Sequence, residues 1–486
     1  MSLFGEHLRS IIEGNKINVY ALSKRAGLDR SAIHKIMSGS KIPVEDYAQK
    51  LAAALPLSPA ERTRFLEAYT ISSVGEQRYK QRKQVKELIE SIAQIEKGFN
   101  AGVVGAWGSI ARLEEADTVV TGSFAVNNLV KNAIAESLFC ENGAGIDFVI
   151  PDSYQYFYNE LLSCYAQNPQ AQIRHIITFA KKIDALDGHN TNIQQIANIL
   201  PLAFASDTGY QPYYFYRSSP DLELTQTMPY FILTSTDKLI LINRKLDRAA
   251  LMCNKDFVQI YKDSFTQMLE QSKPLISTYE NVHEVLAFHA NAIHKDDDEP
   301  VHVINPEPSV EPVFTKEMLD KLIKRDIPDR EELIEMVYKH YGIWRENKNP
   351  YIEVCATNGA YDLIHSGYFF FAPHDLFEPI PKDMMADIMS KMQAKINVKK
   401  LTLLFTDPSK ILLPKKTFIA VSRKSGVIIF TSKGETNCPT DFICICLNED
   451  SITEAVLDFV ESIEQSGLVY SAEESAKTLE SIIGSM

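Results

Sequence analysis

The sequence is poor in cysteine and tryptophan and has no long apolar run. Its 486 residues include seven cysteines and two tryptophans. An odd number of cysteines without framework spacing indicates free thiols in a reducing compartment. No stretch approaches the about 20 apolar residues that a membrane-spanning helix needs, and charges interrupt the N-terminal MSLFGEHLRSII, where a signal peptide has an apolar core. We therefore expect a cytoplasmic globular protein that does not enter a membrane.

The sequence also lacks the short motifs that mark many enzymes and metal proteins. It contains no GKS or GKT, no GxSxG, no HExxH and no HxKxxxxD. Gly102, Gly105 and Gly108 recur every three residues, which favours a hinge over the GxGxxG turn of a dinucleotide site. Cys444 and Cys446 alternate in an apolar run, which is typical of one strand face and not of a metal site. We expect no enzyme activity, no catalytic residues, no metal site and no cofactor.

Charge is unevenly distributed along the chain. The whole sequence has a net charge of −13, yet the first 100 residues contain 16 lysines and arginines against 11 aspartates and glutamates, a net of +5. The remaining 386 residues contain 34 against 52, a net of −18. An acidic body repels the phosphates of nucleic acid, so any contact with them should be confined to the basic N-terminal part.

Between residues 21 and 43 the chain reads ALSKRAGLDRSAIHKIMSGSKIP, two short helical patterns joined by a turn. Gly27 stands at this turn, because glycine adopts a positive φ without a Cβ penalty. Asp29 is expected to cap the second helix, since its carboxylate can accept backbone N–H groups there. The residues expected to face inward, from their helical spacing, are Leu22, Ala26, Ile33, Ile36 and Met37.

The other face of the second helix is polar and basic. Its residue types bind base edges and phosphates in the major groove of DNA. The groove-reading residues expected on this face are Arg30, Ser31, His34 and Lys35. The phosphate contacts expected beside it are Lys24, Arg25 and Lys41. The sequence therefore predicts double-stranded DNA as a partner.

Residues 3 to 71 as a whole resemble the Cro and phage-repressor type of helix-turn-helix domain, the XRE family. The resemblance is carried by Leu22, Ala26, Gly27, Ser31, Ile33, Ile36, Gly39 and Pro43, followed by the apolar helix VEDYAQKLAAAL. It implies an all-α DNA-binding domain over residues 1–72, used as a dimer on two half-sites. The alternative is a five-helix protein-interaction module without DNA binding.

A polar helix with an apolar stripe is predicted over residues 75–99. The stripe at heptad spacing consists of Val85, Leu88, Ile92, Ile95 and Phe99. Such a stripe can join two chains in a coiled coil. Residues 73–100 are therefore expected to be a helical stalk that dimerises the protein. Two heptads are few for an independent coiled coil, and docking of the stripe on the body is the alternative.

The body from residue 101 onward mixes strand-like and helical patterns, which predicts an α/β (α+β) fold. FILTSTDKLILIN and FIAVSRKSGVIIF are typical of hairpins, with turns at Ser235–Asp237 and Arg423–Gly426. Each hairpin precedes a helical segment, and the two segments align Phe265 with Phe459 and share the triplet Glu-Gln-Ser. This favours two related domains, with chance similarity of amphipathic helices as the alternative.

A linker is predicted at residues 294–314, HKDDDEPVHVINPEPSVEPVF. It combines an acidic cluster at Asp296–Glu299 with four prolines and has no helical period. The cluster lacks the glycine and the spaced carboxylates of a calcium loop, so we interpret it as a solvated run. The two regulatory domains are then expected at residues 101–293 and 315–486.

Aromatic residues gather in two runs of the body. The first contains Tyr210, Tyr213, Tyr214, Phe215 and Tyr216 beside Arg217. The second contains Tyr368, Phe369, Phe370, Phe371, His374 and Phe377. Such residues can line a pocket for a small molecule or peptide, and they can equally form core or a dimer interface.

These patterns together predict a multidomain transcriptional regulator with sequence-specific DNA binding. We expect a homodimer whose body senses a small-molecule or peptide effector through residues that the sequence does not identify. Two other classes stay open. One is a repressor-like or antitoxin-like module that binds a protein partner, marked by a broad exposed apolar patch. The other is an enzyme with an appended DNA-binding head, marked by a pocket with perturbed acids or bases.

Overall fold

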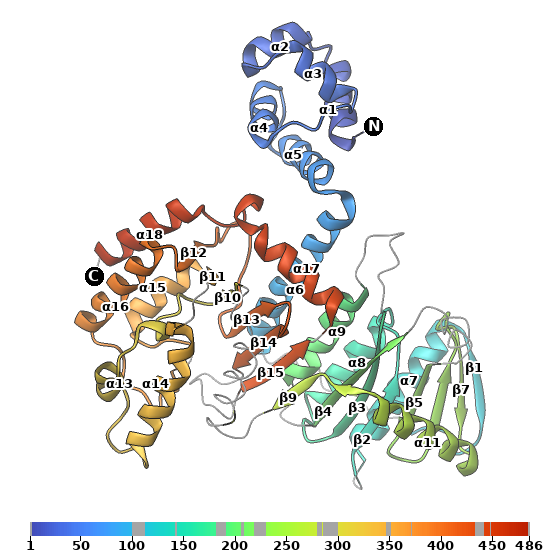
Figure 1. The fold of residues 1–486 in the computed structure, drawn as a ribbon. Coiled ribbons are helices and arrows are strands. Elements are labelled where there is room, and N and C mark those ends of the chain that lie inside the picture. Colours follow the sequence, from blue (N-terminus) through green and yellow to red (C-terminus); the bar gives the residue numbers. More distant parts are fainter. Residues whose placement is uncertain are drawn as a thin grey trace. The chain divides into compact units, whose positions relative to one another are not determined.

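The chain is multidomain and combines helices with two mixed β-sheets (Figure 1). The computed structural model describes residues 2–99, 112–140, 143–180, 191–205, 209–217, 230–278, 284, 300–346, 351–370, 372–432, 442–447 and 449–484. Contacts divide these residues into two compact units. The first unit spans Met1–Gln84, and the second begins at Val85 and includes the described residues that follow.

The first unit is entirely helical. Its helices are α1 (Leu3–Gly14), α2 (Val19–Ala26), α3 (Arg30–Met37), α4 (Glu45–Ala54), α5 (Pro59–Val74) and the start of α6 (Glu76–Phe99). Side chains cap four of them, and Ser58 with Glu61 forms a complete capping box at α5. These caps satisfy backbone N–H groups that a helix cannot pair itself, which fixes where each short helix begins.

The turn between α2 and α3 has the predicted geometry. Gly27 ends α2 with φ 65°, and the Asp29 side chain accepts the Ser31 backbone N–H at 2.6 Å. The residues predicted to face inward are buried, apart from Met37, which is half-buried. A Cβ at Gly5 of α1 would lie 2.4 Å from the Ile36 carbonyl oxygen, so α1 packs directly on the backbone of α3.

Helix α6 begins in the first unit and continues into the second. Val85, Leu88, Ile89 and Ile92 are buried in the main hydrophobic core of the second unit. The prediction of a dimerising stalk is therefore corrected, because the body of the same chain covers this stripe. Ile95 is half-buried on the same core, and the Phe99 side chain lies outside the described residues.

The first sheet belongs to the N-terminal half of the second unit. Its strands are β1 (Thr118–Thr121), β2 (Gly145–Val149), β3 (Gln172–Ala180), β4 (Tyr210–Arg217), β5 (Tyr230–Thr234), β6 (Leu239–Ile242), β7 (Arg248–Met252) and β8 (Lys273–Pro274). They lie in the order β1-β7-β6-β5-β2-β3-β4-β8, with β2, β3 and β4 parallel. The accompanying helices are α7 (Ser123–Leu138), α8 (Gln155–Tyr165), α9 (Thr191–Ala205) and α11 (Lys255–Gln271).

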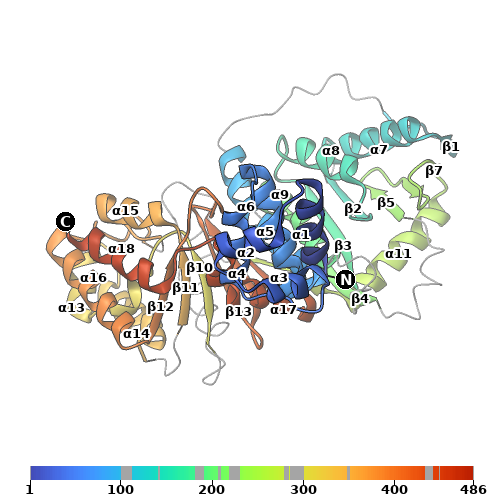
Figure 2. The ribbon, with the colours of Figure 1, turned by 90° about the horizontal axis from the view of Figure 1, so that it is seen from above.

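The second sheet has the order β12-β11-β10-β13-β14-β15-β9, with β10, β11 and β12 parallel. Its strands are β9 (Ile276–Thr278), β10 (His302–Asn305), β11 (Tyr351–Cys355), β12 (Leu401–Phe405), β13 (Thr417–Ser422), β14 (Gly426–Ser432) and β15 (Phe442–Leu447). Its helices are η2 (Glu311–Val313), α13 (Lys316–Leu322), α14 (Arg330–Glu346), α15 (Thr357–Ser366), α16 (Lys382–Asn397), α17 (Asp450–Glu461), η4 (Ile463–Ser466) and α18 (Ala472–Gly484). Figure 2 shows α13 to α16 and α18 gathered around β11 and β12.

The two sheets repeat one topology. Strands β1 to β7 match β9 to β15 one for one in order and direction, and β8 is an additional edge strand. Both predicted hairpins are present, as β5–β6 and β13–β14, and helices α11 and α17 follow equivalent strands. Phe265 and Phe459, which the sequence aligned, are both buried on these helices. The shared topology supports the repeat hypothesis.

One core nevertheless joins both sheets. Phe148 and Ile240 of the first sheet belong to the same hydrophobic cluster as Ile419 and Ile445 of the second, together with Val456 of α17. Strand β9 precedes the predicted linker in the chain and still pairs with β15 of the second sheet. The body is therefore one compact unit, and the predicted boundary between two separate domains is corrected.

The linker prediction at residues 294–314 is wrong for its described part. Residues His302–Asn305 form β10, which lies in the middle of the second sheet with every residue buried. Glu311–Val313 form the buried helix η2. The prolines that indicated a solvated chain instead end a four-residue strand and shape a packed loop after it. The acidic cluster Asp296–Glu299 lies outside the described residues.

Replacing Ile92 with alanine tests the burial of α6. We expect Ile92→Ala to lower the free energy of unfolding by about 2–5 kcal/mol, because it leaves a cavity in a packed core. Urea unfolding at several protein concentrations measures this, and the loss should not depend on concentration. Gln94→Ala, at an exposed position of the same helix, is the control. A loss that grows on dilution would favour a zipper between two chains instead.

Candidate functional site

The predicted groove-reading residues lie together on one exposed face of α3. Arg30 is the first residue of the helix, and Ser31, His34 and Lys35 follow one, four and five residues later. All four are exposed, whereas Ile33 and Ile36 on the opposite face are buried. The helix begins at Arg30 because Asp29 caps it, and the hydrogen bond from the Ser31 backbone holds the pKa of Asp29 below its usual value.

The predicted phosphate contacts lie on neighbouring parts of the first unit and are also exposed. Lys24 and Arg25 occupy the last turn of α2, where positive charge complements the helix dipole. Lys41 follows α3, and its backbone N–H donates to the Lys35 carbonyl at 3.2 Å. The first unit contains 14 lysines and arginines against 8 aspartates and glutamates, a net charge of +6.

Sequence reasoning did not find Arg9, which holds α3 in place. Its guanidinium on α1 donates to the Met37 carbonyl at the C-terminal end of α3, at 2.8 Å. This carbonyl has no partner within a helix that ends there, so the arginine satisfies it. No local pattern around Arg9 reveals the contact, because it joins residues 28 positions apart.

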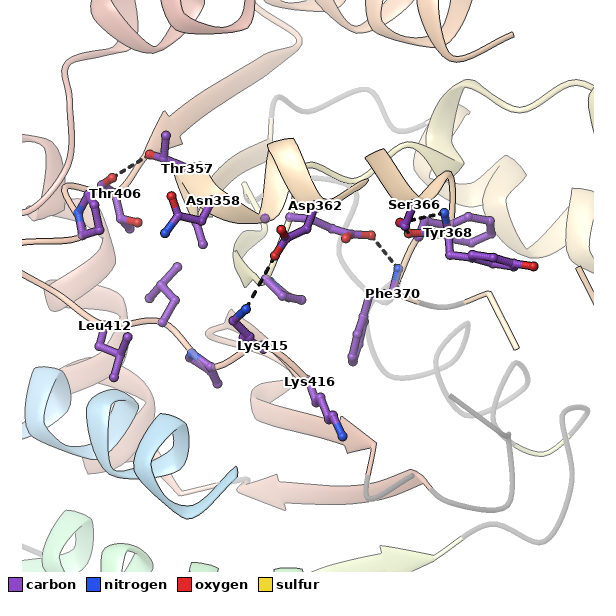
Figure 3. A pocket seen from close by; sticks show the side chains of 18 of the residues that line it. Thr357, Asn358, Asp362, Ser366, Tyr368, Phe370, Thr406, Leu412, Lys415 and Lys416 are labelled. Atoms are coloured by element: carbon purple, nitrogen blue, oxygen red, sulfur yellow. Dashed lines mark hydrogen bonds and ion pairs between the residues drawn. The ribbon is translucent and has the colours of Figure 1, made fainter. Parts of the chain in front are cut away.

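The second unit contains a pocket of about 350 Å³ at the carboxyl ends of β10, β11 and β12 (Figure 3). The loop after each strand contributes to it, with Pro306 and Glu307 after β10, Ala356–Gly359 after β11 and residues from Thr406 to Lys416 after β12. In open α/β sheets, ligands bind at this end of the parallel strands. The pocket therefore stands where the topology of the sheet favours a ligand site.

Helix α15 forms one wall of the pocket. Thr357 in its first turn donates through its hydroxyl to the Thr406 carbonyl at 2.7 Å, which ties the loops after β11 and β12 together. No side chain of the described residues caps the N-terminus of α15. A Cβ at Gly359 would lie 1.8 Å from the Pro306 carbonyl oxygen, so only glycine permits this approach of the helix to the loop after β10.

Charged groups of both signs line the pocket. Lys415 and Asp362 face each other, with Nζ and Oδ2 3.6 Å apart, as Figure 3 shows. Lys416 lies next to Lys415, and Glu307 accepts the Phe370 backbone N–H at 2.5 Å. Loss of water raises the pKa of the Glu307 carboxyl well above its usual value, and three neighbouring carboxylates raise it further.

Two more carboxyl groups are buried near Glu307. Burial raises the pKa of Glu311 to about 8, and it also raises the pKa of Glu353. Glu353 accepts hydrogen bonds from the Ser309 backbone and hydroxyl and from the Asn305 amide, at 2.7 to 3.2 Å. Among the described residues, its second carboxylate oxygen has no hydrogen-bond partner. A carboxyl with a raised pKa holds its proton near neutral pH, so Glu311 adds little negative charge beside the pocket.

The two aromatic runs of the sequence lie in different environments in the structure. Tyr368, Phe369, Phe370 and His374 of the second run line the pocket, and the rings of Tyr368 and His374 lie 3.9 Å apart. Phe377 is buried in the core, and Phe371 lies outside the described residues.

The first run forms strand β4, where Tyr210 and Tyr214 are buried. Tyr213 and Phe215 are half-buried, Tyr216 is exposed, and the Arg217 side chain lies outside the described residues. The Tyr210 hydroxyl lies 2.9 Å from Nδ1 of the buried His175, whose pKa burial lowers to about 3. This run therefore serves as core packing in the described structure.

The cysteine pair and the three glycines singled out in the sequence form no ligand site in the described residues. Cys444 and Cys446 lie on β15 with their sulfur atoms 3.6 Å apart, as alternate residues of a strand should. Gly102, Gly105 and Gly108 lie outside the described residues. Within the described ranges, no three histidine, cysteine or acidic side chains form a group that could hold a metal ion. None of the described helices is long and apolar enough to cross a bilayer.

No protein-family model matches the chain, and no curated protein matches it either. Three solved structures are similar over long stretches at 9 to 10% identity, with TM-scores of 0.22 to 0.25. Polyphosphate kinase from Porphyromonas gingivalis aligns with 71% of this chain, which spans half of that enzyme's length. TrmBL2, described as an archaeal chromatin protein, aligns with 55% of this chain and 98% of its own, and phosphatidylserine synthase from Haemophilus influenzae with 80% and 97%. Scores this low carry no functional argument.

The raised pKa of the buried Glu311 carboxyl predicts how the stability of the protein depends on pH. Its pKa is about 8 in the fold against 4.5 in an unfolded chain, so its contribution to stability is complete below pH 4.5 and is lost as the pH rises toward 8. We expect Glu311→Gln to gain stability relative to the native protein over this range, by at most about 1.4 kcal/mol for each pH unit crossed.

Urea unfolding at pH 5, 6.5 and 8 measures this difference. The control is Glu480→Gln, which removes a charge at an exposed position of α18. A difference between Glu311→Gln and the native protein that stays constant with pH would show that Glu311 is ionised in the fold.

Proposed function

We propose that this protein is a sequence-specific DNA-binding transcriptional regulator. The observation that carries the proposal is the exposed face of α3 with Arg30, Ser31, His34 and Lys35. A short helix held by a capped turn on a second helix is the usual means by which a small helical domain presents side chains to the major groove. Arginine can bind guanine through two hydrogen bonds, and serine, histidine and lysine can contact bases or phosphates.

The charge of the first unit supports the same function. Its net charge of +6 attracts the DNA backbone, and Lys24, Arg25 and Lys41 lie exposed on segments adjoining α3. The rest of the chain is acidic and is repelled by phosphates. DNA binding would then depend on the first unit alone, which leaves the second unit for regulation.

A regulator of this kind works as a dimer on two half-sites one helical turn apart. The stripe on α6 is buried within one chain, so the proposed dimer contact must come from other surfaces. The pocket at the carboxyl ends of β10 to β12 gives the body a place for an effector.

Sequencing the genomic DNA fragments that the full-length protein retains at physiological salt tests DNA recognition directly. We expect a recurrent palindrome whose half-sites lie about one helical turn, or about 10 base pairs, apart. Replacing Arg30 with alanine should weaken binding to that site by about 1–3 kcal/mol, because a two-pronged contact to guanine is lost.

Arg62→Ala is the matched control, since Arg62 is an exposed arginine on α5. It should leave the preference among sequences unchanged. Retention of no particular sequence, or equal losses for Arg30→Ala and Arg62→Ala, would contradict the assignment of α3 to the groove.

Lys24→Ala separates phosphate contacts from base contacts. We expect it to weaken binding to all sequences alike and to reduce the slope of log affinity against log salt by about one. Gel-shift titrations between 50 and 200 mM salt, on the selected site and on unrelated DNA, measure both quantities. A loss confined to the selected site would assign Lys24 to a base instead.

A further inference from the structure

We propose that the pocket at the carboxyl ends of β10 to β12 binds a small organic anion with an apolar body, and that this ligand controls DNA binding through the loop of residues 406–416 and helix α6. The binding site stands on the pocket alone, and the control of DNA binding rests on the proposed function. Neither the ligand site nor its control of DNA binding is implied by the exposed face of α3.

The size and shape of the pocket suit a small molecule. Its volume of about 350 Å³ lies at the lower end of the range for sites that bury most of a ligand. Tyr368 and Phe370 give it an aromatic side and Leu412 an aliphatic one, as Figure 3 shows. An apolar ring or short chain can pack between them and lose contact with water.

Polar groups are drawn between these two apolar sides in Figure 3, and some of them favour negative charge. Asn358 and the uncapped first turn of α15 lie on one side, and Lys415 and Lys416 lie on the other. Backbone N–H groups and the helix dipole at such a turn attract anions, and Lys416 adds a positive charge beside the neutral pair of Lys415 and Asp362.

The carboxyl groups of the pocket do not cancel this charge. Asp362 is paired with Lys415, and Glu307 accepts the Phe370 backbone N–H and has a pKa raised well above its usual value by loss of water, which disfavours its charged form. A carboxylate or phosphate beside these polar groups, joined to an apolar body, matches both kinds of lining residue.

The loop that lines the pocket is also held by α6. The Leu412 backbone N–H donates to Glu90 at 3.4 Å, and the backbone N–H groups of Lys415 and Lys416 donate to the Glu96 carboxylate at 2.6 and 3.1 Å. Leu412, Lys415 and Lys416 thus line the pocket and direct their backbone amide groups to α6. A ligand that moves these side chains also changes the hydrogen bonds that α6 receives.

Helix α6 provides the covalent route from the pocket to the first unit. It is continuous from Glu76 to Phe99, and Glu90 and Glu96 lie on the part that packs in the second unit. Its first residues belong to the first unit, where the Tyr79 hydroxyl donates to Glu67 of α5 at 2.6 Å. A shift or rotation of α6 therefore acts on both units at once.

Calorimetry with the full-length protein tests the site without DNA. The probe is phenyl phosphate, with inorganic phosphate and phenol as its separate halves and benzoate as the carboxylate counterpart. We expect phenyl phosphate or benzoate to bind at least tenfold more tightly than phosphate or phenol, and the better of the two identifies the anionic group.

Two variants locate the binding. Leu412→Trp fills the apolar side of the pocket, and Lys416→Gln removes a positive charge. Each substitution should therefore weaken binding of the probe at least tenfold. Lys410→Gln is the matched control, because Lys410 lies in the same loop and pairs with Asp407 outside the pocket. Absence of binding by all four compounds at millimolar concentration, or equal binding by Leu412→Trp and the native protein, would overturn the site.

A second measurement tests control of DNA binding. Gel shifts on the retained genomic site, with and without saturating probe, should show at least a threefold change in affinity for the native protein. Glu96→Gln should abolish this change in DNA affinity, while calorimetry should still show saturable binding of the probe. A bound probe that leaves DNA affinity unchanged would overturn the coupling. A protein that binds no DNA at all would refute the proposed function and leave the calorimetric result standing.

Discussion

The structure depends on the burial of the apolar side of α6 in the core of the body. Val85, Leu88, Ile89 and Ile92 join a cluster that includes residues of both sheets and of α17. Burying four such side chains contributes several kcal/mol, on the order of 1.5–3 kcal/mol each. The helix is thereby fixed in the second unit while its N-terminal turns belong to the first. Within the described residues, a signal that passes along the chain between the two units passes through this helix.

The topology of the second sheet determines where its loops can form a ligand pocket. Three parallel strands end at one edge, so the loops after β10, β11 and β12 meet there and enclose a pocket. Close packing at Gly359 and the hydrogen bond from Thr357 to Thr406 keep these loops together. Burial raises the pKa of Glu311 to about 8 and that of Glu307 well above its usual value, since it disfavours their charged forms. The site therefore combines an apolar interior with a small number of placed polar groups.

The repeated topology gives the body two similar halves with different surroundings. Equivalent strands β2 to β4 and β10 to β12 both form parallel sets. In the first half, the aromatic run of β4 packs inward around His175. In the second half, Tyr368 and Phe370 turn toward the pocket. The two aromatic runs thus lie in different elements, one on strand β4 and the other after helix α15.

Local features of the chain were determined by the sequence itself. The turn at Gly27, the cap at Asp29, the exposed face of α3 and both hairpins follow from residues within a few positions of one another, and the structure has each of them. Only the tertiary structure decided the rest. It placed the stripe of α6 in the body, made His302–Asn305 of the proline-containing segment 294–314 an inner strand and brought Gly359, Lys415 and Glu307 to one pocket. These outcomes depend on contacts between residues tens to hundreds of positions apart, which no short pattern in the sequence encodes.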